Sequence, residues 1–304
     1  MEHNLKKSEH VTSVATSCVL VSVDISVWGA TKSDKAISDE VVTSKNADKD
    51  SGRFVKNLLA NDIDHKRVMN YRQTVYNWLQ RRTYPFSKAQ NSLPIAMIPK
   101  FNAEWQEHKA EFFRLRDVFC EQYETKVSGM AMKLRDMFNR NDYPSVDEVR
   151  RKFSIDLHIG DVPQGDYRTQ IANDLADELY ENYNSQMKRI VQDIMDKQVH
   201  KLVNVMSSIS HCCDPINTVN TGGETKTKKR RIYDTTITKA LELCDEYRSF
   251  NLTNDSLLEE ARAGLEKALS GVSIDSLRDN DDLRAQVKGD VDDILAKFKP
   301  RVVE

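Results

Sequence analysis

Hydrophobic and polar residues alternate in two short segments of the chain. Residues 18–28 place five hydrophobic side chains on one face and Ser22, Asp24 and Ser26 on the other. Residues 153–159 alternate in the same way. A period of two is typical of a half-buried β-strand, so the sequence predicts two strands, and we expect them to pair.

Two much longer segments repeat with the period of a helix. Hydrophobic residues recur at steps of four and three over 99–137 and again over 168–208, which is the spacing of a coiled-coil seam. Ser128 and Gly129 weaken the first helix, but we do not expect them to break it. Each helix has about 40 residues and a length of about 60 Å. Their matched lengths predict an antiparallel pair.

Shorter helices fill much of the remaining chain. Ser33 is the expected N-cap of one helix, and Ser145 with Glu148 forms the expected capping box of another over 145–152. Further helices are predicted over 62–81, 233–248, 256–269 and 281–298. The expected fold class is therefore mainly α: a long antiparallel helical hairpin, or coiled-coil-like stalk, with a small two-stranded β element and a C-terminal helical module.

The charge pattern suggests a division into parts. Residues 232–304 hold sixteen acids and ten bases, which gives them a net charge of −6. The net charge of the whole chain is only −2, because the preceding residues are mildly basic. We expect a body of strand and helical stalk over 1–209, a basic linker over 210–231 and a small acidic helical module over 232–304. The linker ends in Lys226, Lys228, Lys229, Arg230 and Arg231.

The cysteines and the hydropathy of the chain indicate the kind of cellular compartment in which the protein is expected. Five scattered cysteines predict no disulfide framework and favour a reducing compartment. Lys6 and Lys7 before the apolar residues 14–23 imitate a signal peptide, but the polar interruptions fit the predicted strand better. No segment approaches the roughly 18 apolar residues of a membrane span, so we expect no membrane partner.

Candidate metal sites in the sequence are incomplete. Asp24-Ile-Ser26-Val-Trp28 nearly matches the Asp-x-Ser-x-Ser site of von Willebrand A domains, but Trp28 replaces one oxygen ligand. The run 211–214, His-Cys-Cys-Asp, lacks the second ligand pair that zinc usually needs. We predict no catalytic residue, no metal and no cofactor. A metal-dependent enzyme built on Asp24 and Ser26 remains an alternative.

Two further patterns have a functional and a structural interpretation. The five bases of 226–231 can contact nucleic-acid phosphates, or can simply be a solvated linker. Aromatic residues between 71 and 113 can stack on bases, but aromatics at helical spacing are more often core. We favour the structural interpretation of both patterns.

Several short motifs follow one another along residues 19–163. They are, in order, Ser26-Val-Trp28-Gly-Ala30 with Lys32, Gly52-Arg-Phe54 with Lys56, Arg72, Arg82-Thr-Tyr-Pro85-Phe86, Leu93-Pro94, Phe101, Glu111-Phe112, Phe119 and Tyr123. Together these motifs resemble a domain family of unknown function from bacteriophages and mobile elements. The resemblance implies a gene neighbourhood with MoxR-type AAA+ ATPases and von Willebrand A proteins. It supplies no catalytic residue. Trp28, Pro85 and Phe86 are expected to fix the junction between strand and stalk.

These observations favour a non-enzymatic phage protein. We expect an assembly or adaptor subunit in the cytoplasm of an infected bacterial host, homo-oligomeric and acting on an AAA+ ATPase or a von Willebrand A protein. The alternative is a nucleic-acid-binding factor in phage DNA replication or recombination, with 226–231 as its contact segment.

Overall fold

The computed structural model describes residues 14–49, 51–163, 173–219, 225–253 and 255–298. The protein is mainly α-helical, with a small antiparallel sheet, which confirms the expected class. The chain divides into two compact units. Unit 1 comprises residues 1–20, 84–98 and 160–304, and unit 2 comprises residues 21–83 and 99–159.

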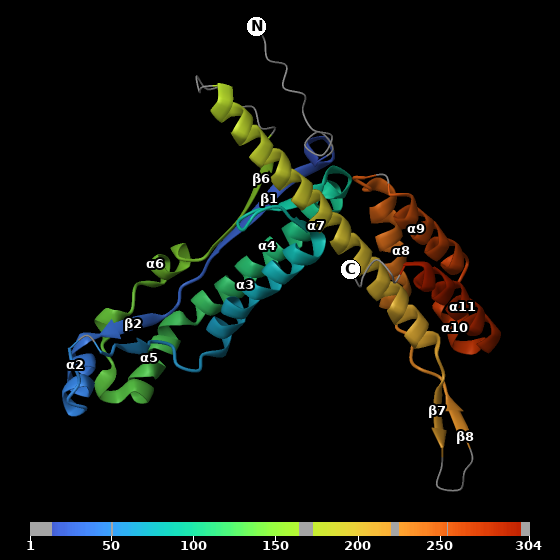
Figure 1. Ribbon diagram of the computed structural model, residues 1–304. Coiled ribbons are helices and arrows are strands. Elements are labelled where there is room, and N and C mark those ends of the chain that lie inside the picture. Colours follow the sequence, from blue (N-terminus) through green and yellow to red (C-terminus); the bar gives the residue numbers. More distant parts are fainter. Residues whose placement is uncertain (1–13, 50, 164–172, 220–224, 254, 299–304) are drawn as a thin grey trace. The chain divides into compact units, whose positions relative to one another are not determined.

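Unit 2 combines a sheet, a β-hairpin and helices (Figure 1). Its strands are β1 (Cys18–Ser26, which begins in unit 1), β2 (Thr31–Asp34), β3 (Phe54–Asn57) and β6 (Ser154–Asp161, which ends in unit 1). Its helices are α2 (Lys35–Ser44), α3 (Ile63–Arg82), α4 (Ile98–Glu121, which begins in unit 1), α5 (Tyr123–Leu134) and α6 (Val146–Arg151), with 3-10 turns η2 (Arg135–Met137) and η3 (Arg140–Asp142).

The two predicted strands are present and are neighbours. The sheet order is β4-β5-β1-β6, in which β1 and β6 are the predicted pair. Val21, Val23 and Ile25 are buried as the alternation requires, but Leu20 is buried as well and Val19 is only half-buried. The buried face of β1 therefore changes between residues 20 and 21. The strand passes from unit 1 to unit 2 at this point.

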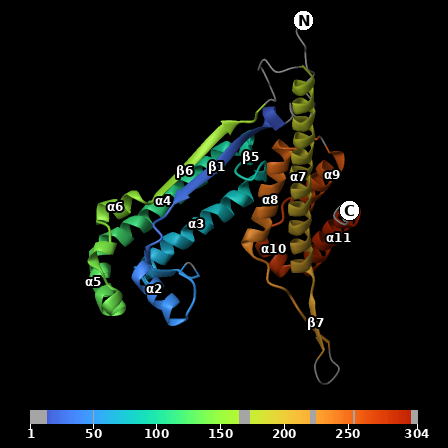
Figure 2. The same cartoon turned by 60° about the vertical axis from the view of Figure 1, so that its left-hand side comes forward.

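Helices α3 and α4 form an antiparallel hairpin in unit 2. Figures 1 and 2 show them side by side. Near the end of α3, Trp78 stacks on Phe101, with ring centroids 4.6 Å apart. Nearer the beginning of α3, His65 contacts Phe119. The end of α3 thus contacts the beginning of α4, and the beginning of α3 contacts the end of α4. The two helices therefore run in opposite directions.

The predicted helix over 99–137 is interrupted at Gln122, which separates α4 from α5. The adjoining Tyr123 is fully buried, and its hydroxyl donates to the Pro144 carbonyl. We attribute the interruption to this tertiary anchor, because the helical pattern itself continues across it. The helix then ends at Leu134, where Arg135 takes a positive φ of 46°.

Capping residues explain the beginnings of the shorter helices. The capping box of Ser145 and Glu148 at α6 is confirmed. The expected cap Ser33 is wrong: Asp34 caps α2, because its carboxylate accepts from the Ile37 backbone N–H. Ser33 instead lies in β2, which pairs antiparallel with the unpredicted β3 and places Lys32 opposite Lys56.

Unit 1 is a helical assembly with two small β elements. Its strands are β4 (Tyr84–Pro85), β5 (Asn91–Pro94), β7 (Ile216–Val219) and β8 (Thr225–Lys228), with the 3-10 turn η1 (Ile95–Met97). Its helices are α7 (Asn173–Cys213), α8 (Asp234–Ser249), α9 (Ser256–Leu269), α10 (Ile274–Asp279) and α11 (Asp281–Phe298). The long helix α7 packs on α8, α9 and α11 around one buried hydrophobic core.

These contacts differ from the expected domain plan. A stalk made of 99–137 and 168–208 is not confirmed. Helices α8, α9, α10 and α11 share a core with α7 instead of forming a separate module. The expected linker over 210–231 includes the end of α7 and the antiparallel hairpin β7–β8. No helix of the described segments is both long and apolar enough to cross a membrane.

Candidate functional site

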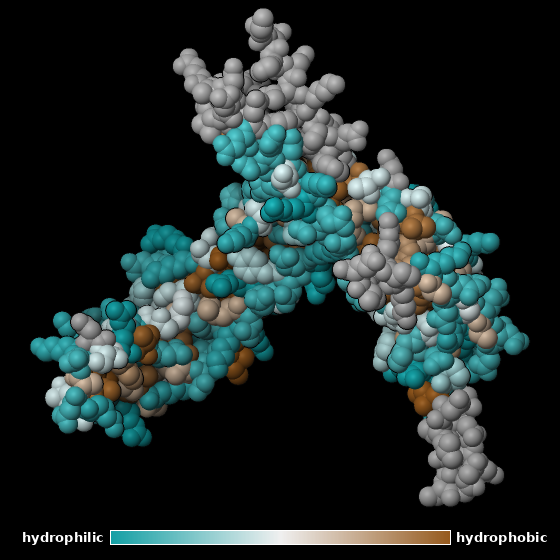
Figure 3. Space-filling model, viewed as in Figure 1, coloured by the Kyte–Doolittle hydropathy of each residue, from teal (hydrophilic) through white to brown (hydrophobic). Residues whose placement is uncertain are grey.

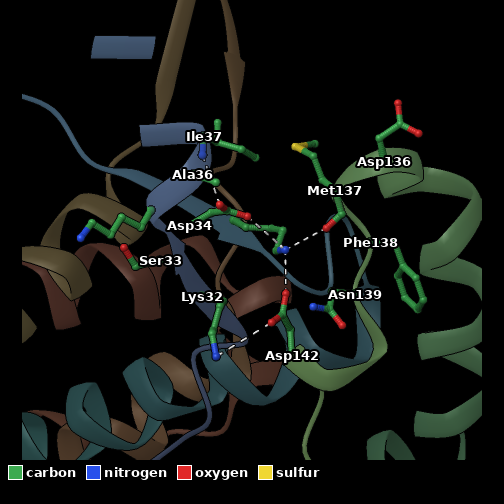
Figure 4. Close-up of a pocket in the computed structure, with 12 residues that line it drawn as sticks. Lys32, Ser33, Asp34, Ala36, Ile37, Asp136, Met137, Phe138, Asn139 and Asp142 are labelled. Carbon is green, nitrogen blue, oxygen red and sulfur yellow. Dashed lines mark hydrogen bonds and ion pairs between the residues drawn. The ribbon is translucent and has the colours of Figure 1, made fainter. Parts of the chain in front are cut away.

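A cavity of about 520 Å³ opens in unit 2 between the β2–β3 hairpin and the segment that follows α5. Figure 4 shows the side chains that line it. They come from β2, the first turn of α2, Lys56 of β3, and residues 136–142. The lining residues are Lys32, Ser33, Asp34, Lys35, Ala36, Ile37, Lys56, Asp136, Met137, Phe138, Asn139 and Asp142.

A buried lysine lies at the centre of the cavity wall. The Lys56 side chain is only 5% exposed, and its Nζ lies 2.6 Å from Asp142 Oδ2 and 3.4 Å from Asp34 Oδ2. It also donates to the Met137 carbonyl oxygen at 2.8 Å. Figure 4 shows these three acceptors converging on one nitrogen. The ammonium group thus satisfies all three of its donors.

Local backbone structure positions both carboxylates. Asp34 ends β2 and caps α2, so one of its oxygens is held by the Ile37 N–H while the other contacts Lys56. Asp142 closes the η3 turn, whose cap Asn139 accepts from the Asn141 N–H. Because each carboxylate is anchored by its own turn, Lys56 connects two segments that are far apart in sequence.

The electrostatics of the cavity favour a fixed ion pair. The hydrogen bond to Asp142 raises the pKa of Lys56 and outweighs the opposing effect of burial. A lysine acts as a nucleophile or general base only when its pKa is lowered toward neutrality. Lys56 is therefore charged at neutral pH, and its geometry suits the fixing of the cavity wall rather than covalent chemistry.

The cavity rim offers both charge signs and hydrophobic side chains. Lys32, Lys35 and Asp136 are exposed around the opening, and Met137 is 38% exposed. Figure 3 shows hydrophobic residues on the surface at the end of unit 2 that holds α2 and α5, where Met132 is 85% exposed. Such a rim can contact a protein partner through apolar and charged side chains together.

Unit 1 contains a second polar cluster, between β4, α7 and α8. The buried Tyr84 hydroxyl donates to Glu246, and Lys201 lies 3.5 Å from the same carboxylate. Lys197 and Lys201 lie over the Tyr84 ring at 5.6 Å and 4.6 Å from its centroid. Burial, with a smaller effect of Lys201, lowers the pKa of Lys197 to about 8.

The thiol groups show the effect of burial more directly. Burial raises the pKa of Cys18 to about 12 and that of Cys244 to about 11. It also raises the pKa of Cys120 and Cys213. Because the thiolate is the reactive form, these four cysteines are poor nucleophiles in the folded chain.

The predicted junction residues fall in different units. Trp28 belongs to unit 2, where it is buried and packs edge-on to Tyr123. Its backbone carbonyl oxygen accepts a hydrogen bond from His65 Nε2 at 2.7 Å. Pro85 lies in β4 of unit 1, and Phe86 packs on the unit 1 core. Each residue has a packing role within its own unit.

The five predicted basic residues occupy two different environments. Lys226 and Lys228 lie in β8, opposite Thr218 and Ile216. Lys229 is instead 2.7 Å from Asp281, and Arg230 donates to the Asp214 carbonyl. The Arg231 guanidinium lies over the Tyr233 ring, at 5.2 Å from its centroid. The run therefore combines a strand with residues that contact the helical part of unit 1.

The incomplete metal motifs do not gain a full set of ligands in the described part of the chain. Asp24 and Ser26 are exposed on β1, and Asp24 Oδ2 lies 3.1 Å from His158 Nε2. Within the described segments, no three His, Cys, Asp or Glu side chains are placed to hold a metal ion. The aromatic residues Trp78, Phe101, Trp105 and Phe112 are buried, as the core interpretation expects.

Sequence reasoning missed the Lys56 cavity. Lys56 belongs to one of the motifs that carry the family resemblance, but the resemblance assigns it no role, Asp142 lies in no such motif, and no strand is predicted at β3. The available signal was a lysine inside a short alternating segment, which alone is an ordinary exposed strand residue. Only the tertiary pairing shows that this lysine is buried.

Comparison with known proteins gives no significant match: no protein-family model, no curated protein and no solved structure matches this chain.

Proposed function

We propose that this chain is a non-enzymatic assembly or adaptor subunit that works by binding a protein partner. The observation that carries the proposal is the Lys56 cavity, whose central lysine is held charged by two carboxylates while its rim exposes Met137, Lys32 and Lys35. A fixed wall with a mixed rim is suited to receiving side chains from another protein. The resemblance of residues 19–163 to a phage family supports an AAA+ ATPase or a von Willebrand A protein as that partner.

A binding experiment with matched variants tests the proposal. The chain is co-expressed with a MoxR-type ATPase, the class of partner that the resemblance implies, and the affinity is measured with purified proteins. Lys35→Glu reverses a charge at the cavity rim, where an acid also suits the N-terminus of α2. Lys45→Glu makes the same change at the exposed other end of α2, outside the cavity lining. We expect weaker binding for the first variant only.

Two outcomes contradict the proposal. The first is the absence of binding between the wild-type proteins at micromolar concentrations. The second is an equal loss of affinity in the Lys35 and Lys45 variants, because a general charge effect would then replace recognition at the cavity. The pairing of the two long helices into one stalk remains a prediction that this experiment does not address.

A second candidate function is nucleic-acid binding in phage replication or recombination. The specific observation in its favour is the antiparallel ribbon β7–β8, which carries Lys226 and Lys228 two positions apart on one strand (Figure 1). The major groove of B-DNA is wide enough for a two-stranded β-ribbon. This mode places two lysines, rather than all five bases, against phosphates.

A mobility assay at several salt concentrations separates this candidate from the first. The double variant Lys226→Gln with Lys228→Gln removes about two phosphate contacts, so the slope of log affinity against log salt becomes shallower by about 1.8. The matched control, Lys239→Gln with Lys267→Gln, removes two exposed lysines of α8 and α9. Equal slopes for the two double variants, or no binding at low salt, contradict the candidate.

A further inference from the structure

Strand β6 is the outermost strand of the sheet. It stands last in the order β4-β5-β1-β6, and no strand follows it among the residues that the structure describes. Figure 2 shows β6 beside β1, with its other side turned away from α3 and α4. An eight-residue edge strand carries a row of backbone N–H and C=O groups that are available to another strand.

The side chains of β6 show where a partner strand fits. Asp156 and His158 are exposed on one face. On the other face, Ile155 is 1% exposed, Leu157 is half-buried and Ile159 is 51% exposed. The segment 155–159 therefore reads Ile-Asp-Leu-His-Ile. Its hydrophobic residues are placed symmetrically about Leu157, and its two polar positions hold an acid on one side of Leu157 and a base on the other.

We propose that two copies of this chain associate by antiparallel pairing of their β6 edges, with Leu157 on the two-fold axis. In this register Ile155 lies opposite the second copy's Ile159, and Asp156 lies opposite its His158. Every hydrophobic residue of the segment then faces another hydrophobic residue, and each acid faces a base. Cross-strand pairs of both kinds stabilise antiparallel sheets. The exposed Ile159 gains an apolar neighbour.

The neighbouring symmetric registers are less favourable. Centring the pair on Asp156 places the two Asp156 carboxylates opposite each other, which is repulsive. Centring it on His158 places Ile155 opposite Asp161 and leaves Asp156 opposite Gly160. A shift by one residue in either direction thus removes the charge pairs, so the side chains specify one register. Within one chain His158 contacts Asp24, and that contact lies on the β1 side of the strand.

This inference does not depend on the proposed adaptor function, because it concerns a different surface and a second copy of the same chain. Failure of partner binding at the Lys56 cavity leaves it unaffected, and a monomeric protein leaves the cavity proposal unaffected.

Cysteine cross-linking tests the register. In Leu157→Cys, the two introduced thiols meet on the axis, so mild oxidation of the full chain produces a covalent species of twice the 34.9 kDa mass. The matched control is Ser154→Cys on the same strand, since residue 154 lies opposite residue 160 and far from its own copy. We expect rapid cross-linking of the first variant only. Equal rates for both, or none for Leu157→Cys, overturn the proposed register.

A charge exchange tests the pair without introducing a thiol. In His158→Asp, two aspartates face each other in both cross-strand pairs of the dimer, and in Asp156→His two histidines do. We expect either variant to raise the dimer dissociation constant, measured by light scattering, about ten-fold. The double exchange, Asp156→His with His158→Asp, restores the pairing and the wild-type constant. Single variants that dimerise like the wild-type protein, or a wild-type protein that is monomeric throughout the micromolar range, contradict the proposal.

Discussion

Lys56 Nζ lies 2.6 Å from Asp142 Oδ2, so a lysine of β3 is neutralised by an aspartate of the η3 turn. The Lys56 side chain is almost fully buried, and that of Asp142 is 12% exposed. Removing one partner of a buried pair leaves the other charge without compensation, which costs far more than the loss of an exposed pair. The contact therefore makes the β2–β3 hairpin and the segment after α5 mutually dependent.

Replacing Lys56 tests this dependence. Lys56→Met leaves Asp142 and Asp34 facing each other, so we expect the free energy of unfolding of unit 2 to fall by about 2–4 kcal/mol. Tryptophan fluorescence in a urea titration reports on unit 2 alone, because all three tryptophans, at positions 28, 78 and 105, lie in it. The midpoint should shift without a large change in slope.

Lys32→Met is the matched control for that variant. Lys32 is 54% exposed and lies 3.9 Å from the same Asp142 carboxylate. An exposed pair of this kind contributes about 1 kcal/mol or less. A loss as large as that of Lys56→Met would show that the charge balance of Asp142, and not the burial of Lys56, determines stability.

The local pattern of the sequence was sufficient for much of the secondary structure. The strands at β1 and β6, the helices α3, α8, α9 and α11, and the capping box at Ser145 all follow from periodicity and capping. These features depend on neighbours within a few residues. The partner against which a long helix packs cannot be predicted from such local signals. The hydrophobic seam of 168–208 fits any apolar surface of suitable length.

The features that were missed depend on distant contacts. The expected linker over 210–231 contains a ribbon whose ends are fixed by Arg284, a residue of α11. The interruption at Gln122 follows from the burial of Tyr123, and the burial of Lys56 follows from Asp142. A single sequence contains no periodic signal for such pairs, so these parts of the fold and the cavity were not predictable from it.

Acid should weaken unit 2 through Asp64. The hydrogen bond from Lys126 lowers the pKa of Asp64, and Lys126 Nζ also lies 2.8 Å from Asp62. A carboxylate whose pKa is lowered by folding stabilises the native state above its unfolded pKa of about 3.9. That stability is lost as the pH falls through the lower folded pKa.

Fluorescence-monitored unfolding between about pH 6 and pH 2 measures this loss. We expect Asp64→Asn to reduce the steepness of the acid limb and to lower stability at neutral pH by about 1 kcal/mol. Asp39→Asn, at an exposed position of α2, is the control. The assignment to Asp64 fails when both variants retain the wild-type acid limb.

Lys197 should give unit 1 a pH dependence of the same sign, but in the alkaline range. Its pKa is lowered to about 8, first by burial and then by Lys201. The unfolded chain, with a lysine pKa near 10.4, binds more protons between about pH 8 and pH 10, so the stability of unit 1 rises with pH in that window. Below about pH 8 the destabilising effect is fully present.

Lys197→Met removes the buried charge, and we expect it to stabilise unit 1 by about 1–2 kcal/mol at pH 7. Amide hydrogen exchange of α7 and α8 measures unit 1, which contains no tryptophan. Lys239→Met at an exposed position of α8 should have little effect. A pH-independent exchange rate of the wild-type helices, after correction for intrinsic chemistry, would contradict the linkage.

Arg284 should hold the base of the β7–β8 ribbon. Its guanidinium donates at 2.7 Å to the carbonyls of Cys212 and Arg230, which lie just before and just after the ribbon. The side chain is 5% exposed, so Arg284→Met leaves two carbonyl oxygens without their donors, at a cost of about 2–3 kcal/mol.

We expect amide exchange in Arg284→Met to accelerate at residues 212–216 and 228–232 more than at the middle of α7. Arg248→Met is the matched control, because Arg248 belongs to the same unit and is 53% exposed in its pairs with Asp245 and Glu266. An exposed pair contributes about 1 kcal/mol or less, so this variant should leave the ribbon unchanged. Uniform acceleration along α7 in Arg284→Met would show instead that the arginine stabilises the helical core as a whole, and that the ribbon has no local anchor at this position.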